Sequence, residues 1–276
     1  MSDKPGIIIA VDKPTGWSSF QVVNKLKWHI KRTFGLNKFK IGHAGTLDPL
    51  ASGLLLVCVG SATKHIEELQ AGIKEYSGTM VLGATTPCYD LEQAIDAYYP
   101  IDGIDADRLE AARLRFIGII EQVPPMFSAV KIDGQRAYVS ARDGEAATIA
   151  PKNVTVYDFK ITAYRPGSSS QPVAMKQKLS TLPSPVSERH LYRNPQGTVP
   201  EELPQLDFRI SCSKGTYIRS IARDLGAMLD SGAFLSALRR ERIGDYSLDE
   251  AISIDCIETV ITTENPLFSS LAQMRN

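Results

Sequence analysis

The stretch GLLLVCVG at residues 53–60 constrains the fold of this chain more than any other part of its sequence. Six consecutive apolar residues between two glycines are typical of a short buried strand. The turn directly before it, GHAGTLDPLAS, contains an acid, Asp48. A carboxylate between a glycine-rich turn and a buried strand is either a turn-stabilising group or a catalytic group on a rigid base, and composition alone leaves both alternatives open.

The remaining elements mix strands and helices without a regular alternation. GIIIAVDKP, which starts at residue 6, predicts a strand, and a helix capped by Ser18 or Ser19 should follow it. We expect further strands at 75–83, 152–165 and 206–215, and helices between 60 and 75, after Asp105 or Asp107, and at 216–232 with Gly232 as the stop. Residues 124–142 predict a strand, an Asp-Gly turn and a helix. This pattern favours an α+β fold, with a largely antiparallel mixed sheet flanked by helices.

Composition predicts a globular chain. Its 276 residues, 43% of them hydrophobic, suit one large domain or one domain with a small appendage. No segment approaches the roughly 18 apolar residues of a membrane span, and the apolar run near the start is short for a signal peptide, so we expect no membrane association and a cytoplasmic location. The four scattered cysteines favour neither a disulfide framework nor a metal site.

One segment differs in composition from the rest. Residues 166–204 are rich in Ser, Pro, Gln and Gly, and we interpret them as a mobile insertion between two strands. Glycine-rich loops of the kinds that bind nucleotide phosphates do not occur in the sequence, which disfavours nucleotide-cofactor enzymes.

The charges are unevenly distributed although the formal net charge is +0. No acid occurs from Lys13 to Leu47, whereas acids are concentrated between Asp90 and Glu110. Such a basic segment with aromatic residues can contact phosphates and nucleobases, or it can be an ordinary solvated helix face. The residues in it that are candidates for phosphate contact are Lys25, Lys27, Lys31, Arg32, Lys38 and Lys40.

Five motifs, in this order and spacing, resemble those of the TruB family of tRNA pseudouridine synthases. They are VDKPTGWSS (11–19), GHAGTLDPLASGLLLVCVGSATK (42–64), KEYSGTMVLGATT (74–86), VPPMFSAVKIDGQRAY (123–138) and CSKGTYIRSIARDLG (212–226). The likeness extends from about residue 6 to about residue 260. It implies the pseudouridine synthase fold and an isomerase that converts uridine to pseudouridine at position 55 in the T arm of tRNA, with no cofactor and no metal.

The resemblance also implies catalytic roles for three residues. Asp48 falls on the family's catalytic aspartate, which acts on the ribose of the target uridine, either at C1′ or by removing a C2′ proton. Arg219 matches the arginine that pairs with this aspartate. Tyr76 matches the tyrosine that stacks on the flipped base and serves in removing the C5 proton.

Other matched positions imply binding or support. Tyr217 and Leu238 align with residues that line the base pocket, and His43 aligns with a histidine that fills the space left by the extruded nucleotide. Lys13 and Pro14 match a pair that supports the site without contacting RNA. Under this resemblance the basic segment would position the tRNA arm through its phosphates.

Two departures from the family pattern are evident. After LGATT the chain continues PCYDLEQAID, so the contribution of this loop to RNA contact is in doubt, although Asp90 retains its place. Only about 30 residues follow Tyr246, too few for the RNA-binding PUA domain that many relatives carry. We therefore expect a catalytic domain over 1–250, including the 166–204 insertion, and a short helical extension over 251–276.

Two other functions remain as alternatives. A tRNA-binding or tRNA-folding protein with incidental or lost catalysis would share the basic surface, and the presence of all three expected catalytic side chains argues only against the loss. A glycoside or nucleoside hydrolase would need a second carboxylate near the motifs, and none stands out. Nothing in the sequence demands more than a monomer.

Overall fold

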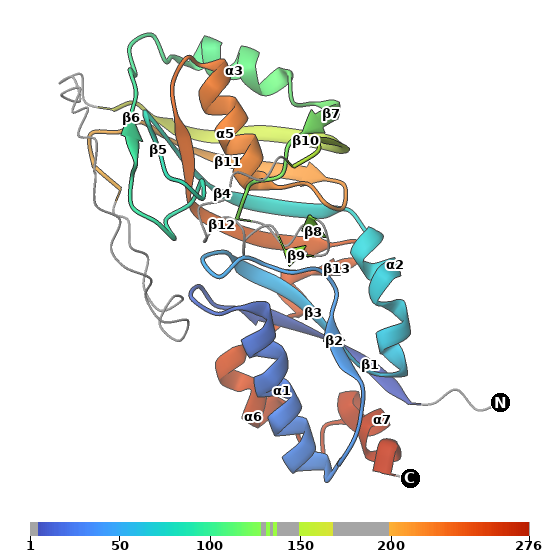
Figure 1. The fold of residues 1–276 in the computed structure, drawn as a ribbon. Helices are drawn as coiled ribbons and strands as arrows, with labels where there is room; N and C mark the ends of the chain where they lie inside the picture. Colours follow the sequence, from blue (N-terminus) through green and yellow to red (C-terminus); the bar gives the residue numbers. More distant parts are fainter. Residues whose placement is uncertain (1–4, 128–130, 133–134, 137–148, 168–198, 276) are drawn as a thin grey trace. The chain divides into compact units, whose positions relative to one another are not determined.

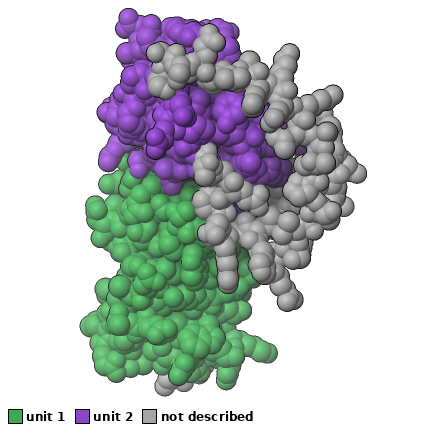
Figure 2. All heavy atoms as spheres, turned by 90° about the vertical axis from the view of Figure 1, so that its left-hand side faces the viewer, with its two compact units in different colours: residues 1–76, 239–276 green, residues 77–238 purple. Residues whose placement is uncertain are grey.

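The structure is a computed structural model that describes residues 5–127, 131–132, 135–136, 149–167 and 199–275. The chain divides into two compact units, shown in Figure 2, of which unit 1 is residues 1–76 and 239–276 and unit 2 is residues 77–238. Strands β4 (Lys74–Leu82) and β12 (Ala233–Ile243) have residues in both units. Most of the predicted 166–204 insertion and of the expected helix before residue 142 lies outside the described residues.

The sheet of unit 1 is built around the buried strand. β3 (Ser52–Gly60) is buried from Gly53 to Val59 and pairs antiparallel with β1 (Gly6–Lys13) along its length. The strand order in this unit is β14-β1-β3-β12, with β14 (Ile252–Ser253) parallel to β1 and the end of β12 parallel to β3. The short strands β2 (Ile41–His43) and β13 (Tyr246–Ser247) pair with β3 and β12.

Helix α1 (Ser19–Phe34) covers this sheet with a face of Val, Leu, Ile and Phe side chains. It begins where predicted, because the Ser18 side chain accepts a hydrogen bond from the Gln21 backbone and the Gln21 side chain bonds back to the Ser18 amide. It ends at Gly35, which has a left-handed conformation. The predicted helix between β3 and β4 is α2 (Ile66–Ala71), preceded by a 3₁₀ turn at Ser61–His65.

The C-terminal residues pack into the same core. We expected a helical extension there; the structure has β14 followed by short helices that include α6 (Ile257–Val260) and α7 (Ser269–Ala272). Figure 1 shows α6 beside α1, and the buried cluster joins side chains from both ends of the chain. Its C-terminal members are Ile254, Ile257, Ile261, Phe268 and Leu271.

Unit 2 is also a sheet covered by helices. Its strand order is β12-β4-β11-β10-β7, where β11 (Gln205–Cys212), β10 (Lys152–Arg165) and β7 (Gly118–Gln122) pair antiparallel. Helices α3 (Ala106–Leu114), capped by Asp105, and α5 (Ile218–Met228) lie side by side in Figure 1. Two small hairpins complete the unit: β5 (Ala84–Thr85) with β6 (Ala97–Tyr98), and β8 (Lys131–Ile132) with β9 (Gln135–Arg136).

This architecture confirms the predicted α+β class with a largely antiparallel mixed sheet. Several features differ from the sequence prediction: β7 was not predicted, and β9 is a strand directly after the Asp-Gly turn, where a helix was expected. The predicted stop of α5 at Gly232 is wrong, because the helix ends at Met228 and Asp230 turns the chain in a left-handed conformation with φ 57°. β12 was not predicted, since its segment FLSALRRERI has charges at successive positions and therefore lacks a strand's alternation.

Candidate active site

Asp48 lies in the turn between β2 and β3, in unit 1. The turn begins at Gly45, which has a φ of 93° that favours glycine. At its other end the Ala51 amide donates a hydrogen bond to the Asp48 carbonyl at 3.1 Å. The Ala44 amide donates to the Leu56 carbonyl at 2.9 Å, which ties the turn to the buried strand. The half-buried Asp48 side chain therefore stands on a closed loop rather than on a flexible one.

The start of α1 holds this turn from one side. The buried Ser19 hydroxyl donates to the Leu47 carbonyl at 3.1 Å and accepts from the Leu47 amide at 2.9 Å. The Gly16 amide donates to the Pro49 carbonyl at 2.8 Å. Both residues next to Asp48 in the chain are thus fixed, and Ser19, expected from the sequence only as a possible helix cap, also anchors the turn.

The fully buried side chain of Lys13 also contacts this turn. Its Nζ donates to the carbonyls of Pro14 at 3.0 Å, Trp17 at 2.6 Å and Pro49 at 3.2 Å. Burial lowers the pKa of Lys13 to about 7, although attraction to the neighbouring Asp48 carboxylate opposes that shift. The structure therefore places Lys13 and Pro14 under the turn, in positions compatible with the support role that the resemblance implies.

Two further predicted residues are described in unit 1. His43 is half-buried at the end of β2, opposite Val57, and burial together with the Arg240 cation lowers its pKa, so the imidazole is neutral near pH 7. Tyr76 is half-buried on β4. The start of that strand is anchored by Lys74, whose buried ammonium donates to the Gln70 carbonyl and, at 2.6 Å, to the Gly72 carbonyl.

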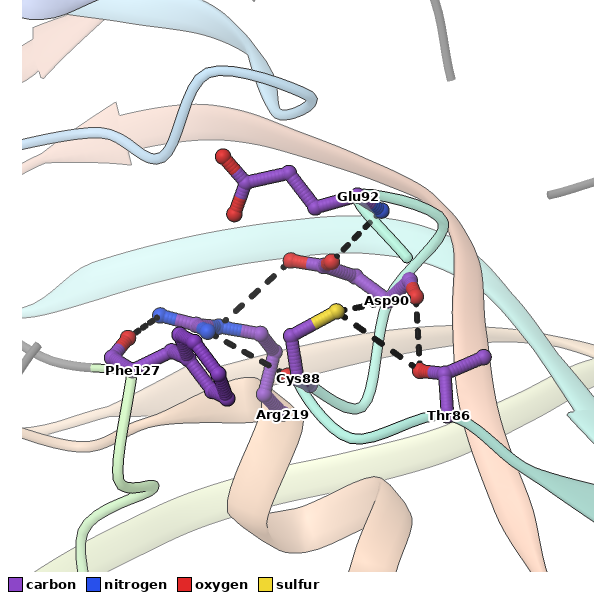
Figure 3. Close-up of polar contacts among 6 residues, drawn as sticks. All are labelled: Thr86, Cys88, Asp90, Glu92, Phe127 and Arg219. Atoms are coloured by element: carbon purple, nitrogen blue, oxygen red, sulfur yellow. Dashed lines mark hydrogen bonds and ion pairs between the residues drawn. The ribbon is translucent and has the colours of Figure 1, made fainter. Parts of the chain in front are cut away.

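Arg219 is held in unit 2 by an almost fully buried polar cluster, shown in Figure 3. It lies in the first turn of α5, and its Nε is 3.7 Å from Oδ2 of Asp90. Its Nη1 donates to the Cys88 carbonyl at 3.2 Å and its Nη2 to the Phe127 carbonyl at 2.9 Å. These contacts orient the planar guanidinium in one direction.

Asp90 is itself held by the loop whose role the sequence left in doubt. The Glu92 amide donates to Asp90 Oδ1 at 2.9 Å, and the Thr86 hydroxyl donates to the Asp90 carbonyl at 2.7 Å, as Figure 3 shows. Burial raises the pKa of the Cys88 thiol to about 12, so this cysteine is an inert member of the cluster. In this chain, the segment PCYDLE therefore serves to place an acid beside Arg219.

Tyr217 occupies the N-cap position of α5, two residues before Arg219, and its side chain makes no capping hydrogen bond. The fully buried Gln122 side chain accepts a hydrogen bond from the Tyr217 amide at 2.8 Å and donates to the Tyr217 carbonyl at 3.1 Å. The Lys152 ammonium lies over the Tyr217 ring, 4.6 Å from its centroid. Sequence reasoning missed Gln122 and Lys152, because a lone glutamine and a lone lysine on strands carry no local signal.

The structure thus assembles two parts of the predicted site, one in each unit. Asp48, His43, Tyr76, Lys13 and Pro14 belong to unit 1, and Tyr217, Arg219 and the half-buried Leu238 on β12 belong to unit 2. The pairing of Asp48 with Arg219 stays a prediction.

The basic segment forms the solvent face of α1 and the loop after it. Lys27, Lys31, Arg32, Lys38 and Lys40 are exposed, and Lys25 is half-buried with its Nζ 5.6 Å from the centre of the Trp17 ring. Trp28 is 56% exposed, with the Arg32 guanidinium 5.3 Å from its ring centre. In contrast, His29 and Phe34 are buried in the core. Within α1, the exposed surface thus combines cations with an aromatic face.

Other kinds of site find no support in the described part of the chain. No described helix is long and apolar enough to cross a membrane. Among the described residues, no three His, Cys, Asp or Glu side chains cluster as metal ligands. The four cysteines are free thiols, and only Cys256 is exposed.

Comparison with known sequences gives concordant matches. Residues 31–181 match the model of the TruB family pseudouridylate synthase N-terminal domain. The chain is 43% identical over 255 residues to the tRNA pseudouridine synthase B of Phocaeicola vulgatus, covering 92% of this chain and 93% of that protein. It is 45% identical over 254 residues to the protein of the same name from Flavobacterium johnsoniae, covering 92% and 95%.

Comparison with solved structures supports the fold. A chain in the crystal structure of a Cbf5–Nop10–Gar1 complex superposes with a TM-score of 0.60 at 24% sequence identity, covering 98% of this chain and 59% of that chain. A chain of an H/ACA RNP bound to a substrate RNA containing 2′-deoxyuridine gives a TM-score of 0.56 at 22% identity, covering 98% and 62%.

Proposed function

The chain belongs to the TruB family of pseudouridylate synthases, and we propose that it isomerises the uridine at position 55 in the T arm of tRNA to pseudouridine. The family assignment makes the chain an isomerase. The relatives named tRNA pseudouridine synthase B, which match over more than nine-tenths of this chain, support tRNA as the substrate.

The observation that carries the proposal is the way in which the Asp48 turn is fixed. Ser19, Gly16 and Lys13 all bond to the residues on either side of Asp48. A carboxylate on so rigid a base suits a reaction at one sugar, because a misplacement of about 1 Å is costly to a near-attack geometry. Attack at C1′ and proton removal at C2′ both require this ionised carboxylate at the ribose.

We assign Arg219 to the orientation of the Asp48 carboxylate. The guanidinium is a permanent cation, and the buried Asp90 and two backbone carbonyls already define its plane. Because its orientation is already fixed, this guanidinium can pair with a carboxylate without losing further side-chain freedom. Asp90 then acts through Arg219 as its positioning residue.

The remaining predicted residues would bind the extruded base. Tyr76 offers an aromatic face and a phenol, for stacking and for removing the C5 proton. Tyr217 and Leu238 would line the pocket, and the neutral His43 would fill the space that the nucleotide leaves. Unstacking the uridine costs a few kcal/mol, which stacking on these side chains and phosphate contacts along α1 would offset.

The test is to incubate the protein with an unmodified tRNA transcript and to map pseudouridine by sequence position. Wild-type protein should form pseudouridine at position 55, whereas Asp48→Asn should form none and keep its tRNA affinity within about threefold, because the substitution removes the catalytic charge and few phosphate contacts. Asp245→Asn, which alters an exposed acid in the same unit, is the matched control and should remain active.

A transcript with cytidine at position 55 controls for the site of modification and should gain no pseudouridine in its T loop. Activity in Asp48→Asn would refute the assignment of Asp48. Tight tRNA binding by the wild type without any product would instead favour the tRNA-binding function.

A further inference from the structure

Arg240 is a charged side chain in the interior of unit 1. It lies on β12 and is only 1% exposed, which makes it one of the largest fully buried side chains among the described residues. The hydrogen-bond partners described for its guanidinium are backbone carbonyls. A buried cation without a carboxylate partner is costly, and an apolar side chain of similar volume would fill the same space. Packing alone therefore does not account for an arginine here.

Arg240 forms hydrogen bonds with backbone carbonyls before and after Asp48 in the sequence. Its Nη2 donates to the Gly45 carbonyl at 3.1 Å and its Nη1 to the Thr46 carbonyl at 3.5 Å, both before Asp48 in the chain. Its Nε donates to the Leu54 carbonyl at 2.8 Å, on the buried strand after Asp48. One rigid guanidinium thus joins the entrance of the turn to the strand that follows its exit.

The backbone fixes the place from which Arg240 reaches the turn. β12 and β3 pair in parallel at Arg240 and Gly53. Gly53 has φ 102°, and a Cβ there would lie 2.3 Å from the Arg240 carbonyl oxygen, so the close approach of the two strands requires glycine. The pairing of β12 with β3 therefore fixes the position of the Arg240 backbone relative to β3.

Arg240 also contributes to the charge beneath the turn. Its cation lowers the pKa values of Lys13 and His43, which places it within electrostatic reach of both. Lys13 in turn interacts with the Asp48 carboxylate. Two buried basic side chains thus support the turn: Arg240 binds carbonyls before and after Asp48, and Lys13 binds the carbonyl of Pro49, directly after it.

We propose that Arg240 is a positioning residue for Asp48: it holds the entrance of the Asp48 turn against β3 so that the carboxylate meets the ribose in one geometry. The clamp itself is defined by the contacts of unit 1. Its catalytic consequence rests on the function proposed above.

The test compares Arg240→Lys with Arg242→Lys. Lysine retains the charge at 240 but cannot bond three carbonyls in one plane. Arg242 is the matched control, because it lies on the same strand with its side chain 43% exposed and its Nε 3.6 Å from Glu75. Arg240→Gln, which is uncharged but still donates hydrogen bonds, is a second variant. Circular dichroism selects variants that keep the native secondary structure.

Two measurements are made on each variant. The first is hydrogen exchange of the amides of Ala44, Leu47 and Ala51, which are bonded in the wild-type turn. The second is the single-turnover rate of pseudouridine formation, measured beside the Kd for tRNA. We expect Arg240→Lys to exchange these amides at least about tenfold faster and to react about 100-fold more slowly, with the Kd within about threefold. Arg242→Lys should match the wild type in all three.

Unchanged amide exchange in both Arg240 variants would overturn the clamp. Faster exchange with an unchanged rate, or a rate loss matched by an equal loss of tRNA affinity, would overturn the positioning role. A wild-type protein that forms no pseudouridine would refute the proposed function instead, and the exchange measurement would still decide whether Arg240 holds the turn.

Discussion

At Lys13, burial and the nearby Asp48 carboxylate shift the pKa in opposite directions. Its ammonium is fully buried and bonded to three carbonyls, and burial lowers its pKa from 10.5 to about 7. The unfolded chain therefore binds this proton more tightly than the folded chain does. Between pH 7 and about 10 the unfolded state holds more protons, so the contribution of Lys13 to the free energy of unfolding rises with pH.

This dependence can be measured by urea unfolding of the wild type and Lys13→Met at pH 7, 8 and 9. The methionine has a similar length and does not titrate. The difference in unfolding free energy, wild type minus variant, should increase by up to about 1.4 kcal/mol for each pH unit above 7. Below about pH 6, where Lys13 is protonated in both the folded and the unfolded state, the difference should be flat. A difference that stays constant from pH 7 to 9 would show that Lys13 keeps an ordinary pKa in the folded protein.

Helix α1 shows how one element serves the core and the surface at once. Its buried face packs Val22, Leu26 and Ile30 against the sheet, and its N-terminal Ser19 anchors the Asp48 turn. The opposite face carries Lys27, Trp28, Lys31 and Arg32. Because the first turn of α1 bonds the Asp48 turn, cations along α1 would bind phosphates near the candidate catalytic residue.

Charge reversal on this face should weaken tRNA binding. We expect Lys27→Glu, Lys31→Glu and Arg32→Glu in combination to raise the Kd for tRNA by about tenfold or more near 0.1 M salt, because each phosphate contact releases counterions. The slope of log Kd against log salt concentration should become shallower by roughly one for each phosphate that the variant no longer binds. Filter binding across a salt series measures both quantities.

Asn24→Ala changes an exposed neutral residue of the same helix and serves as the control. If the triple variant kept the wild-type Kd and the wild-type salt slope, the basic face would be an ordinary solvated surface.

On the scale of the whole molecule, unit 1 is built from both ends of the chain. β14 pairs with β1, and C-terminal side chains such as Ile257 and Phe268 lie in one cluster with Val11 and Leu26. The C-terminal segment is thus a structural part of the unit that carries Asp48. Its removal would expose the apolar surface under α1 and β1.

A single substitution tests this dependence. Ile257 is fully buried, and Ile257→Ala should lower the free energy of unfolding by about 2–5 kcal/mol through lost burial and the cavity left behind. Leu267→Ala, in the same C-terminal segment and 73% exposed, should change it by less than about 0.5 kcal/mol. Urea unfolding followed by circular dichroism measures both. Equal effects of the two substitutions would show that the segment does not pack as described.

The sequence by itself determined the features that depend on neighbouring residues. The buried strand at 53–60 follows from its continuous apolar run, and the start of α1 follows from the serine cap before it. The ordered motifs likewise predicted the family and the fold class. These signals are local, so they can be recognised without knowing what the rest of the chain contacts.

Only the tertiary structure decided which charges are buried and what they hold. The RRER run at 239–242 looks like a solvated surface in sequence, yet Arg240 lies in the core and bonds residues near the other end of the chain. Asp90 likewise meets Arg219 from a distant part of the sequence, and the C-terminus completes the core begun by β1. Such contacts depend on how distant strands align, and the cost of burying a charge is met only when those strands supply its hydrogen-bond partners.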